Sequence, residues 1–99
     1  MRRAKFLASV RADFLDIFAH VAKTSGSVSA GEGFVRRLRE KCHELAGLKA
    51  TIGRPRPELR PDMRSFPYKG YVIFFRYFEG HFEVVNIIEG HSDIDTFFR

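Results

Sequence analysis

Arginine supplies most of the chemistry that this sequence could perform. Arg54, Arg56 and Arg60 lie in a proline-rich stretch, and Arg64 and Arg76 follow on two segments that are apolar enough to be strands. A guanidinium is planar and permanently charged, so it can hold a phosphate or a carboxylate through two parallel hydrogen bonds. We therefore expect Arg54, Arg56, Arg60 and Arg64 to contact an anionic target.

Arg64 and Arg76 can also be interpreted as braces within the fold. On adjacent antiparallel strands the two side chains could lie close together on one face, where each could pair with Glu58, Asp62 or Asp93. Arg76 lies inside the most apolar segment, so we expect Arg76 to be structural, together with Asp93. Arg64 lies beside the proline-rich loop, so we expect it to face the target.

Groups that could act as acids, bases or metal ligands are scattered. His91 could be a general base, although a lone histidine beside a turn is more often a surface or capping residue. His20, His43 and His81 have no spacing with Cys42 that would form a zinc site. We expect no catalytic residue, no metal and no cofactor. The single cysteine excludes an internal disulfide and is compatible with the reducing cytoplasm, where we expect the protein to act.

The net charge of +5 is unevenly distributed. Residues 36–76 hold eleven Lys and Arg against four Asp and Glu, whereas residues 77–98 hold five acids and no Lys or Arg. The basic middle of the sequence, followed by an acidic end, favours an anionic partner, either a nucleic acid or an acidic protein surface. No stretch approaches the roughly 20 apolar residues of a membrane span, so we expect no membrane partner.

The 99 residues are expected to form one domain, spanning 1–99. Apolar residues recur at spacings of three and four over 10–21 and over 34–45, which predicts two helices. Ser9 is expected to cap the first helix and Gly26 to end it. Ser29 and Glu32 have the spacing of a capping box for the second helix. The short link between them implies an antiparallel helical hairpin.

Strand patterns occur before and after this hairpin. Residues 5–8 form a short candidate at the N-terminus, and further strands are predicted at 63–67, 71–78 and 82–88. The three prolines of residues 52–61 indicate a loop. The predicted fold is α+β with the order β-α-α-β-β-β, in which the antiparallel helical hairpin packs on a mainly antiparallel sheet. The N-terminal strand is expected at an edge, where it could make the sheet mixed.

These pieces, in this order, resemble the ParE/RelE toxins, small basic proteins of bacterial toxin–antitoxin pairs. The resemblance covers nearly the whole chain and leans toward ParE. It is carried by Asp13-Phe14-Leu15-Asp16-Ile17, Gly53-Arg54, Glu58-Leu59-Arg60, Met63-Arg64-Ser65, the run Tyr71–Arg76 and Glu89-Gly90-His91-Ser92-Asp93. It implies a non-enzymatic toxin that poisons DNA gyrase and is neutralised by a ParD-like antitoxin made beside it.

Two other functions fit the same resemblance. RelE-like members cut messenger RNA on the ribosome, and a member that has lost toxicity would act only as a binding module in an antitoxin–repressor complex. The RelE chemistry needs an acid or base near the tail, often tyrosine or histidine, and His91 is the one such residue there. At the tail, Glu89 and Ser92 replace a histidine and an arginine that ParE chains often have, while Gly90 and Asp93 match.

The resemblance also suggests how the antitoxin would bind. We expect an amphipathic antitoxin tail to lie along the helical hairpin and against the sheet, forming a hetero-oligomer. The expected contact residues are Arg36, Arg37, Arg56, Phe97 and Phe98. We do not expect this chain alone to bind a specific DNA sequence.

Overall fold

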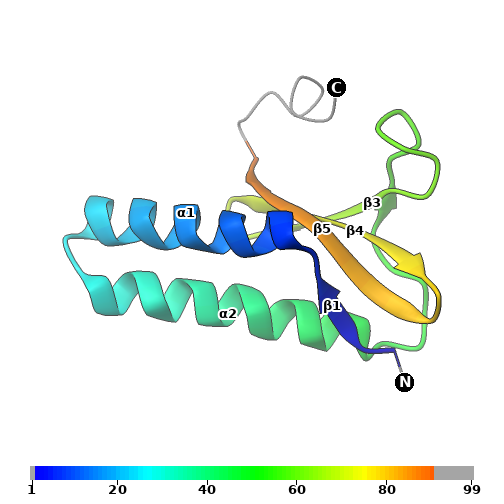
Figure 1. The fold of residues 1–99 in the computed structure, drawn as a ribbon, viewed down its shortest axis with the longest axis horizontal. Coiled ribbons are helices and arrows are strands. Elements are labelled where there is room, and N and C mark those ends of the chain that lie inside the picture. Colours follow the sequence, from blue (N-terminus) through cyan, green and yellow to red (C-terminus); the bar gives the residue numbers. More distant parts are fainter. Residues whose placement is uncertain (1, 91–99) are drawn as a thin grey trace.

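A computed structural model describes residues 2–90 and shows an α+β fold in two layers. The helices α1 (Ala8–Ser25) and α2 (Val28–Ala46) form the antiparallel hairpin, and α1 packs on the last strand (Figure 1). The sheet has the order β1-β5-β4-β3-β2, with strands β1 (Ala4–Phe6), β2 (Arg54–Pro55), β3 (Arg64–Tyr68), β4 (Tyr71–Phe78) and β5 (His81–Glu89). β1 pairs parallel to β5 and the other neighbours are antiparallel, so the predicted mixed sheet is confirmed. No helix among residues 2–90 has the length and apolar character needed to cross a membrane.

Beyond the end of β1, side chains of α1 form hydrogen bonds with the backbone of β5. β1 pairs with β5 only as far as Val84. Beyond that point the Ser9 hydroxyl donates to the Val85 carbonyl over 2.6 Å, and the Asp13 carboxylate accepts from the Ile87 amide over 2.9 Å. Ser9 and Asp13 are four residues apart on α1, so they lie on one helix face. This face of α1 therefore takes the place of a neighbouring strand.

The sheet buries apolar side chains on both faces. The face toward the helices carries the main core, which comprises Val10, Phe14, Ile17, Leu38, Cys42, Leu45, Ala46, Ile73, Phe75, Phe82, Val84 and Ile87. The opposite face, called here the helix-free face, carries a smaller cluster of Met63, Phe74, Val85 and Ile88. Leu59 packs on this second cluster from the proline-rich loop. The near-continuous apolar pattern of β4 and β5 reflects this burial on two sides.

Both predicted N-terminal caps were wrong in position. α1 begins at Ala8 with Leu7 at the N-cap, so Ser9 lies inside the first turn and bonds to β5 instead. α2 is capped by Ser27, whose hydroxyl accepts from the Ala30 amide over 3.1 Å. Ser29 therefore lies within the helix, two residues past the cap. Gly26 ends α1 in a left-handed conformation, as predicted.

The proline-rich stretch is not wholly a loop, because Arg54 and Pro55 form the edge strand β2 opposite Ser65 and Arg64. Glu79 and Gly80 form a two-residue turn between β4 and β5, with positive φ at both residues. A second two-residue turn of the same kind joins β3 to β4 at residues 69–70. Both turns suit the right-handed twist of the hairpins that they close.

The link from α2 to β2 is fixed against the sheet at Ile52 and Gly53. The Ile52 amide donates to the Tyr77 hydroxyl over 3.0 Å, and Arg64 donates to the carbonyls of Ile52 and Gly53 over 2.8 and 2.9 Å. Gly53 has φ +85°, and a Cβ added there would lie 2.7 Å from the Phe75 ring. The Gly-Arg pair thus places a residue without a side chain where the backbone crosses an aromatic ring.

Gly53→Ala should lower the free energy of unfolding by about 2–4 kcal/mol, because left-handed backbone strain and steric overlap add. Gly80→Ala is the matched control, since Gly80 also has positive φ but an added Cβ would meet nothing within 4 Å. The control should lose about 1–2 kcal/mol. Urea unfolding of the two variants measures the difference. Equal losses would show that the overlap with Phe75 adds nothing to the cost of Gly53→Ala.

Candidate functional site

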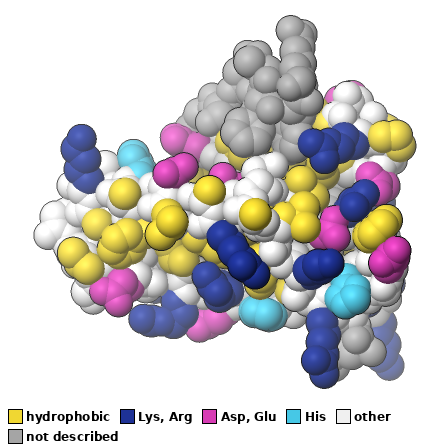
Figure 2. All heavy atoms as spheres, viewed as in Figure 1, with side chains coloured by type: hydrophobic (Ala, Val, Ile, Leu, Met, Phe, Trp, Pro, Cys, Tyr) yellow, Lys and Arg dark blue, Asp and Glu magenta, His cyan; other side chains and the backbone are white. Residues whose placement is uncertain are grey.

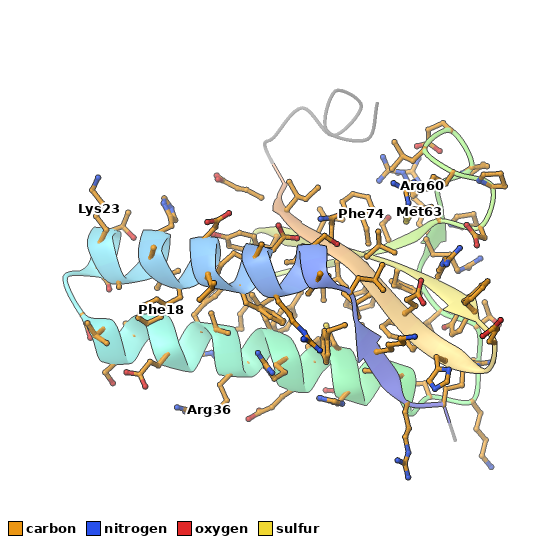
Figure 3. All side chains as sticks on the ribbon, viewed as in Figure 1. Phe18, Lys23, Arg36, Arg60, Met63 and Phe74 are labelled. Carbon is orange, nitrogen blue, oxygen red and sulfur yellow. The ribbon has the colours of Figure 1, made fainter. Side chains whose placement is uncertain are left out.

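The helix-free face gathers most of the arginines that the sequence singled out. Strand register places Arg54 opposite Ser65 and Ser65 opposite Phe74, so these residues share that face. Arg56 continues the same row, because its guanidinium lies 5.7 Å from the Phe74 ring and 3.5 Å from the Ser65 hydroxyl. Figure 3 shows Arg60 and Met63 close together at the proline-rich loop.

Arg56 is held in place by its neighbours. Its Nε donates to the Glu58 carboxylate over 2.7 Å, and its side chain is only 17% exposed. The hydrogen bond from Arg56 is the main reason that the pKa of Glu58 lies below its usual value. The Glu58 side chain is 52% exposed, so solvent screens the pair. The pair therefore contributes little to stability and mainly orients the guanidinium.

Arg76 forms a second network on the helix-free face, and one of its two acids is buried. Its Nε donates to Glu83 over 2.8 Å and its Nη1 donates to Asp62 over 3.2 Å. The Glu83 side chain is 5% exposed, and its hydrogen bond is the largest cause of the raised pKa of Arg76. The Arg76 guanidinium also lies 4.1 Å from the centre of the Phe78 ring. These contacts support the structural role predicted for Arg76. Its partners lie on β5, on the loop before β3 and at the end of β4.

The expectation that Arg64 and Arg76 share a face was wrong. Arg64 lies opposite Phe75, whose ring belongs to the helix-side core, and Arg76 is the next residue along β4. Alternation along a strand sends the two side chains to opposite faces. Arg64 uses its guanidinium to hold the link at residues 52–53, so the structure gives it a positioning role. Contact between Arg64 and a target stays a prediction.

A groove on the outer side of the helical hairpin combines apolar and cationic side chains. We name it the α1–α2 groove; it is lined by Arg11, Phe14, Leu15, Phe18, Glu32, Val35, Arg36 and Arg39. Leu15 is 70% exposed, and the Arg39 guanidinium lies 4.8 Å from the Phe14 ring centre. Figure 2 shows hydrophobic side chains along the hairpin with Lys and Arg side chains beside them. In Figure 3, Phe18 lies between the two helices.

The residues expected to bind an antitoxin are not all in this groove. Arg36 lines it, whereas Arg37 packs its guanidinium toward Gly33 on α2. Arg56 lies on the helix-free face. Phe97 and Phe98 lie outside the described residues, as do His91, Ser92 and Asp93. Arg11 and Arg39 were missed by sequence reasoning, although their spacing from the apolar residues of α1 and α2 could have placed them at the groove.

Reactive groups are not assembled among residues 2–90. Burial raises the pKa of the Cys42 thiol to about 12, so the thiolate needed for nucleophilic attack is scarce at neutral pH. No group of three His, Cys, Asp or Glu side chains in this part of the chain could hold a metal ion. What the arrangement offers is a set of oriented guanidinium groups on one face and a cationic groove on the other.

Comparison with known proteins agrees with this fold. The sequence matches the family described as "ParE toxin of type II toxin-antitoxin system, parDE" over residues 4–94. The chain belongs to the ParE toxin family. Among solved structures, its fold is similar to a chain of the "Chromosomal ParDE TA system from P. aeruginosa", with a TM-score of 0.79 at 20% sequence identity. That similarity covers 90% of this chain and 96% of the other. None of the curated proteins matches the sequence.

In this ParE-family chain, Arg76→Ala should lower the free energy of unfolding by about 2–3 kcal/mol, because it leaves the buried Glu83 carboxylate without its cation. Glu44→Ala is the control, since the Glu44 side chain is 63% exposed and its pair with Lys41 at i, i+3 should contribute about 0.3–0.5 kcal/mol. Denaturant unfolding at pH 7 measures both. A loss for Arg76→Ala no larger than the control's would mean that Asp62 and Glu83 do not need the guanidinium.

Proposed function

We propose that this chain is the toxin of a type II toxin–antitoxin pair, that it inhibits DNA gyrase in the cytoplasm by binding, and that a ParD-like antitoxin neutralises it. The observation that carries the proposal is the match to the ParE toxin family over residues 4–94. Within the ParE/RelE resemblance, this match favours gyrase inhibition over cleavage of messenger RNA.

The target contact is proposed for the helix-free face. Arg54 and Arg60 are exposed there, and Arg56 is oriented by Glu58, so three guanidinium groups are presented from one short segment. Pro55 and Pro57 limit the backbone freedom of this segment, which lowers the entropy lost on binding. Arg64 would support the contact indirectly, because it fixes the link from which Arg54 extends.

The antitoxin contact is proposed for the α1–α2 groove. An exposed leucine flanked by Arg11, Arg36 and Arg39 suits an amphipathic segment with an apolar stripe and acidic flanks. The apolar part would supply most of the affinity, and the charged rim would raise the association rate. An antitoxin that also reached Arg56 would have to continue around the chain to the helix-free face.

The purified chain should inhibit the supercoiling of relaxed plasmid by gyrase and leave messenger RNA on ribosomes intact. A supercoiling assay and a primer-extension assay on translating ribosomes test the two outcomes side by side. Codon-phased cleavage of messenger RNA without gyrase inhibition would falsify the proposal and favour the RelE-like alternative. Inactivity in both assays, with the chain folded, would favour the non-toxic binding module.

The doubly substituted variant Arg54→Ala/Arg60→Ala should raise the concentration needed for half-inhibition of gyrase about tenfold or more, because two charged contacts are removed. Lys23→Ala/Arg37→Ala is the control with the same loss of charge, since both cations are exposed on the helical hairpin. Melting temperatures show whether both variants are folded. Equal weakening of the two variants would place the target contact elsewhere.

Leu15→Asp should weaken antitoxin binding at least tenfold, because it replaces an exposed apolar side chain that lines the α1–α2 groove with a carboxylate. Arg36→Glu should act mainly on the association rate and reduce its dependence on salt. Val28→Asp is the control for Leu15→Asp, since Val28 is 61% exposed on α2 but does not line the groove. Surface plasmon resonance at three salt concentrations measures the rates, and unchanged binding by Leu15→Asp would exclude this groove.

A further inference from the structure

Phe78 is an exposed aromatic side chain at the end of β4, on the helix-free face. Phe74, Arg76 and Phe78 lie two residues apart along the strand, so their side chains point to the same face. Phe78 is 41% exposed, and no other phenylalanine or tyrosine among residues 2–90 is as exposed. The β4–β5 turn beside it lies at the end of the molecule away from the α1–α2 turn (Figure 1). An aromatic ring is thus available to a partner on the face proposed for target binding.

The Arg76 guanidinium supports one side of the Phe78 ring. Its central carbon lies 4.1 Å from the ring centre. The same guanidinium donates to Glu83 over 2.8 Å and to Asp62 over 3.2 Å, so it cannot leave the ring without breaking two charged hydrogen bonds. A side chain that is held in place before binding loses less rotational freedom when a partner covers it. Arg76 therefore orients Phe78 as a preformed contact.

Positive charge borders the Phe78 ring on two sides. Lys5 lies opposite Glu83 in the β1–β5 register, so the Lys5 side chain points to the helix-free face beside the Arg76 network. Lys5 is exposed, and none of the ion pairs among residues 2–90 includes it. On the other side, Asp62 joins Arg76 to the proline-rich loop, which carries the arginines proposed for target contact. We name Lys5, Arg76 and Phe78 the Phe78 patch.

The composition of the Phe78 patch favours a protein partner. Sites for single-stranded nucleic acid stack successive bases on several aromatic side chains. Among residues 2–90 one such ring is exposed, and one of its sides lies against Arg76. Hot spots of protein interfaces, by contrast, centre on an aromatic residue or an arginine surrounded by a polar rim. The complementary surface on a partner would hold an apolar pocket for Phe78 and acidic groups facing Lys5 and the arginines of the loop.

We propose that the Phe78 patch is part of the contact with gyrase, and that Phe78 anchors this contact by entering an apolar pocket on the enzyme. The inference rests on the proposed inhibition of gyrase, and it extends the target contact from the proline-rich loop to the end of β4. Lys5 and the arginines of the loop mainly raise the association rate, whereas burial of the Phe78 ring slows dissociation.

Hydroxyl-radical footprinting of the full chain, alone and with purified gyrase in the absence of DNA, tests the contact directly. Saturating gyrase should lower the oxidation of Phe78 several-fold, because the ring becomes covered. Leu48 is the internal control, since it is 44% exposed on the link after α2 and its oxidation should not change. Unchanged oxidation of Phe78 in the complex would overturn the proposal. Protection of Phe78 by a single-stranded oligonucleotide in place of gyrase would also overturn it, because the ring would then stack on bases.

Phe78→Ala should raise the concentration needed for half-inhibition of gyrase about thirtyfold, which corresponds to an anchor residue that contributes about 2 kcal/mol. Leu48→Ala is the matched control, because it truncates an apolar side chain of similar exposure outside the Phe78 patch. The control should change the half-inhibitory concentration by about threefold or less. Melting temperatures show whether both variants are folded, and the footprint of the original chain decides the question if Phe78→Ala is not.

Failure of the anchor and failure of the proposed function give different results. If the original chain inhibits gyrase and the folded Phe78→Ala variant inhibits it as well as Leu48→Ala does, the anchor is wrong and gyrase inhibition stands. If the original chain neither binds nor inhibits gyrase, the proposed function and the Phe78 contact are both wrong.

Discussion

The contact between α1 and the open edge of β5 is the constraint on which the rest of the fold depends. β5 contains one extra residue relative to β4, since Phe74 lies opposite Asn86 while Phe75 lies opposite Val84. The carbonyl of the extra residue, Val85, receives the Ser9 hydroxyl. The Asp13 carboxylate then takes the Ile87 amide. Each buried backbone group left unpaired here would cost about 1–3 kcal/mol, so the bulge and the helix position stabilise each other.

This contact separates the charged surfaces of the chain. With α1 held on β5, the helical hairpin covers one face of the sheet and leaves the other to the proline-rich loop. Arginines then serve in three ways. Arg64 and Arg76 hold backbone or carboxylate groups of the chain itself, Arg56 is oriented at the surface by Glu58, and Arg54 remains exposed. One residue type thus braces the sheet and also supplies the proposed contact surfaces.

Much of the fold could be predicted from the sequence, because it depends on periodicity. The helices, the last two strands and the Glu79-Gly80 turn follow from apolar spacing and from glycine at a position with positive φ. The helix starts were less predictable, because Ser29 has the local capping-box spacing with Glu32 and yet Ser27 caps the helix. The role of Ser9 as a partner for β5 depends on a contact 76 residues away in the chain. The partners of Arg64 were unpredictable for another reason. They are backbone carbonyls, which every residue has, so the residue types at 52 and 53 do not reveal them.

The pairing of β1 with β5 joins the two ends of the described chain. Ala4 lies beside Phe82, and the strand order requires nearly the whole chain to be present before β1 and α1 have their partner. Contacts of such high sequence separation form late in folding, because the chain between them must first lose its conformational freedom. On the ribosome, residues emerge at about 5–20 per second, so the helical hairpin is synthesised seconds before the strand that receives it. Until β5 emerges, the nascent chain lacks the sheet that orients Arg56 and Arg76, and its surfaces are assembled only near the end of synthesis.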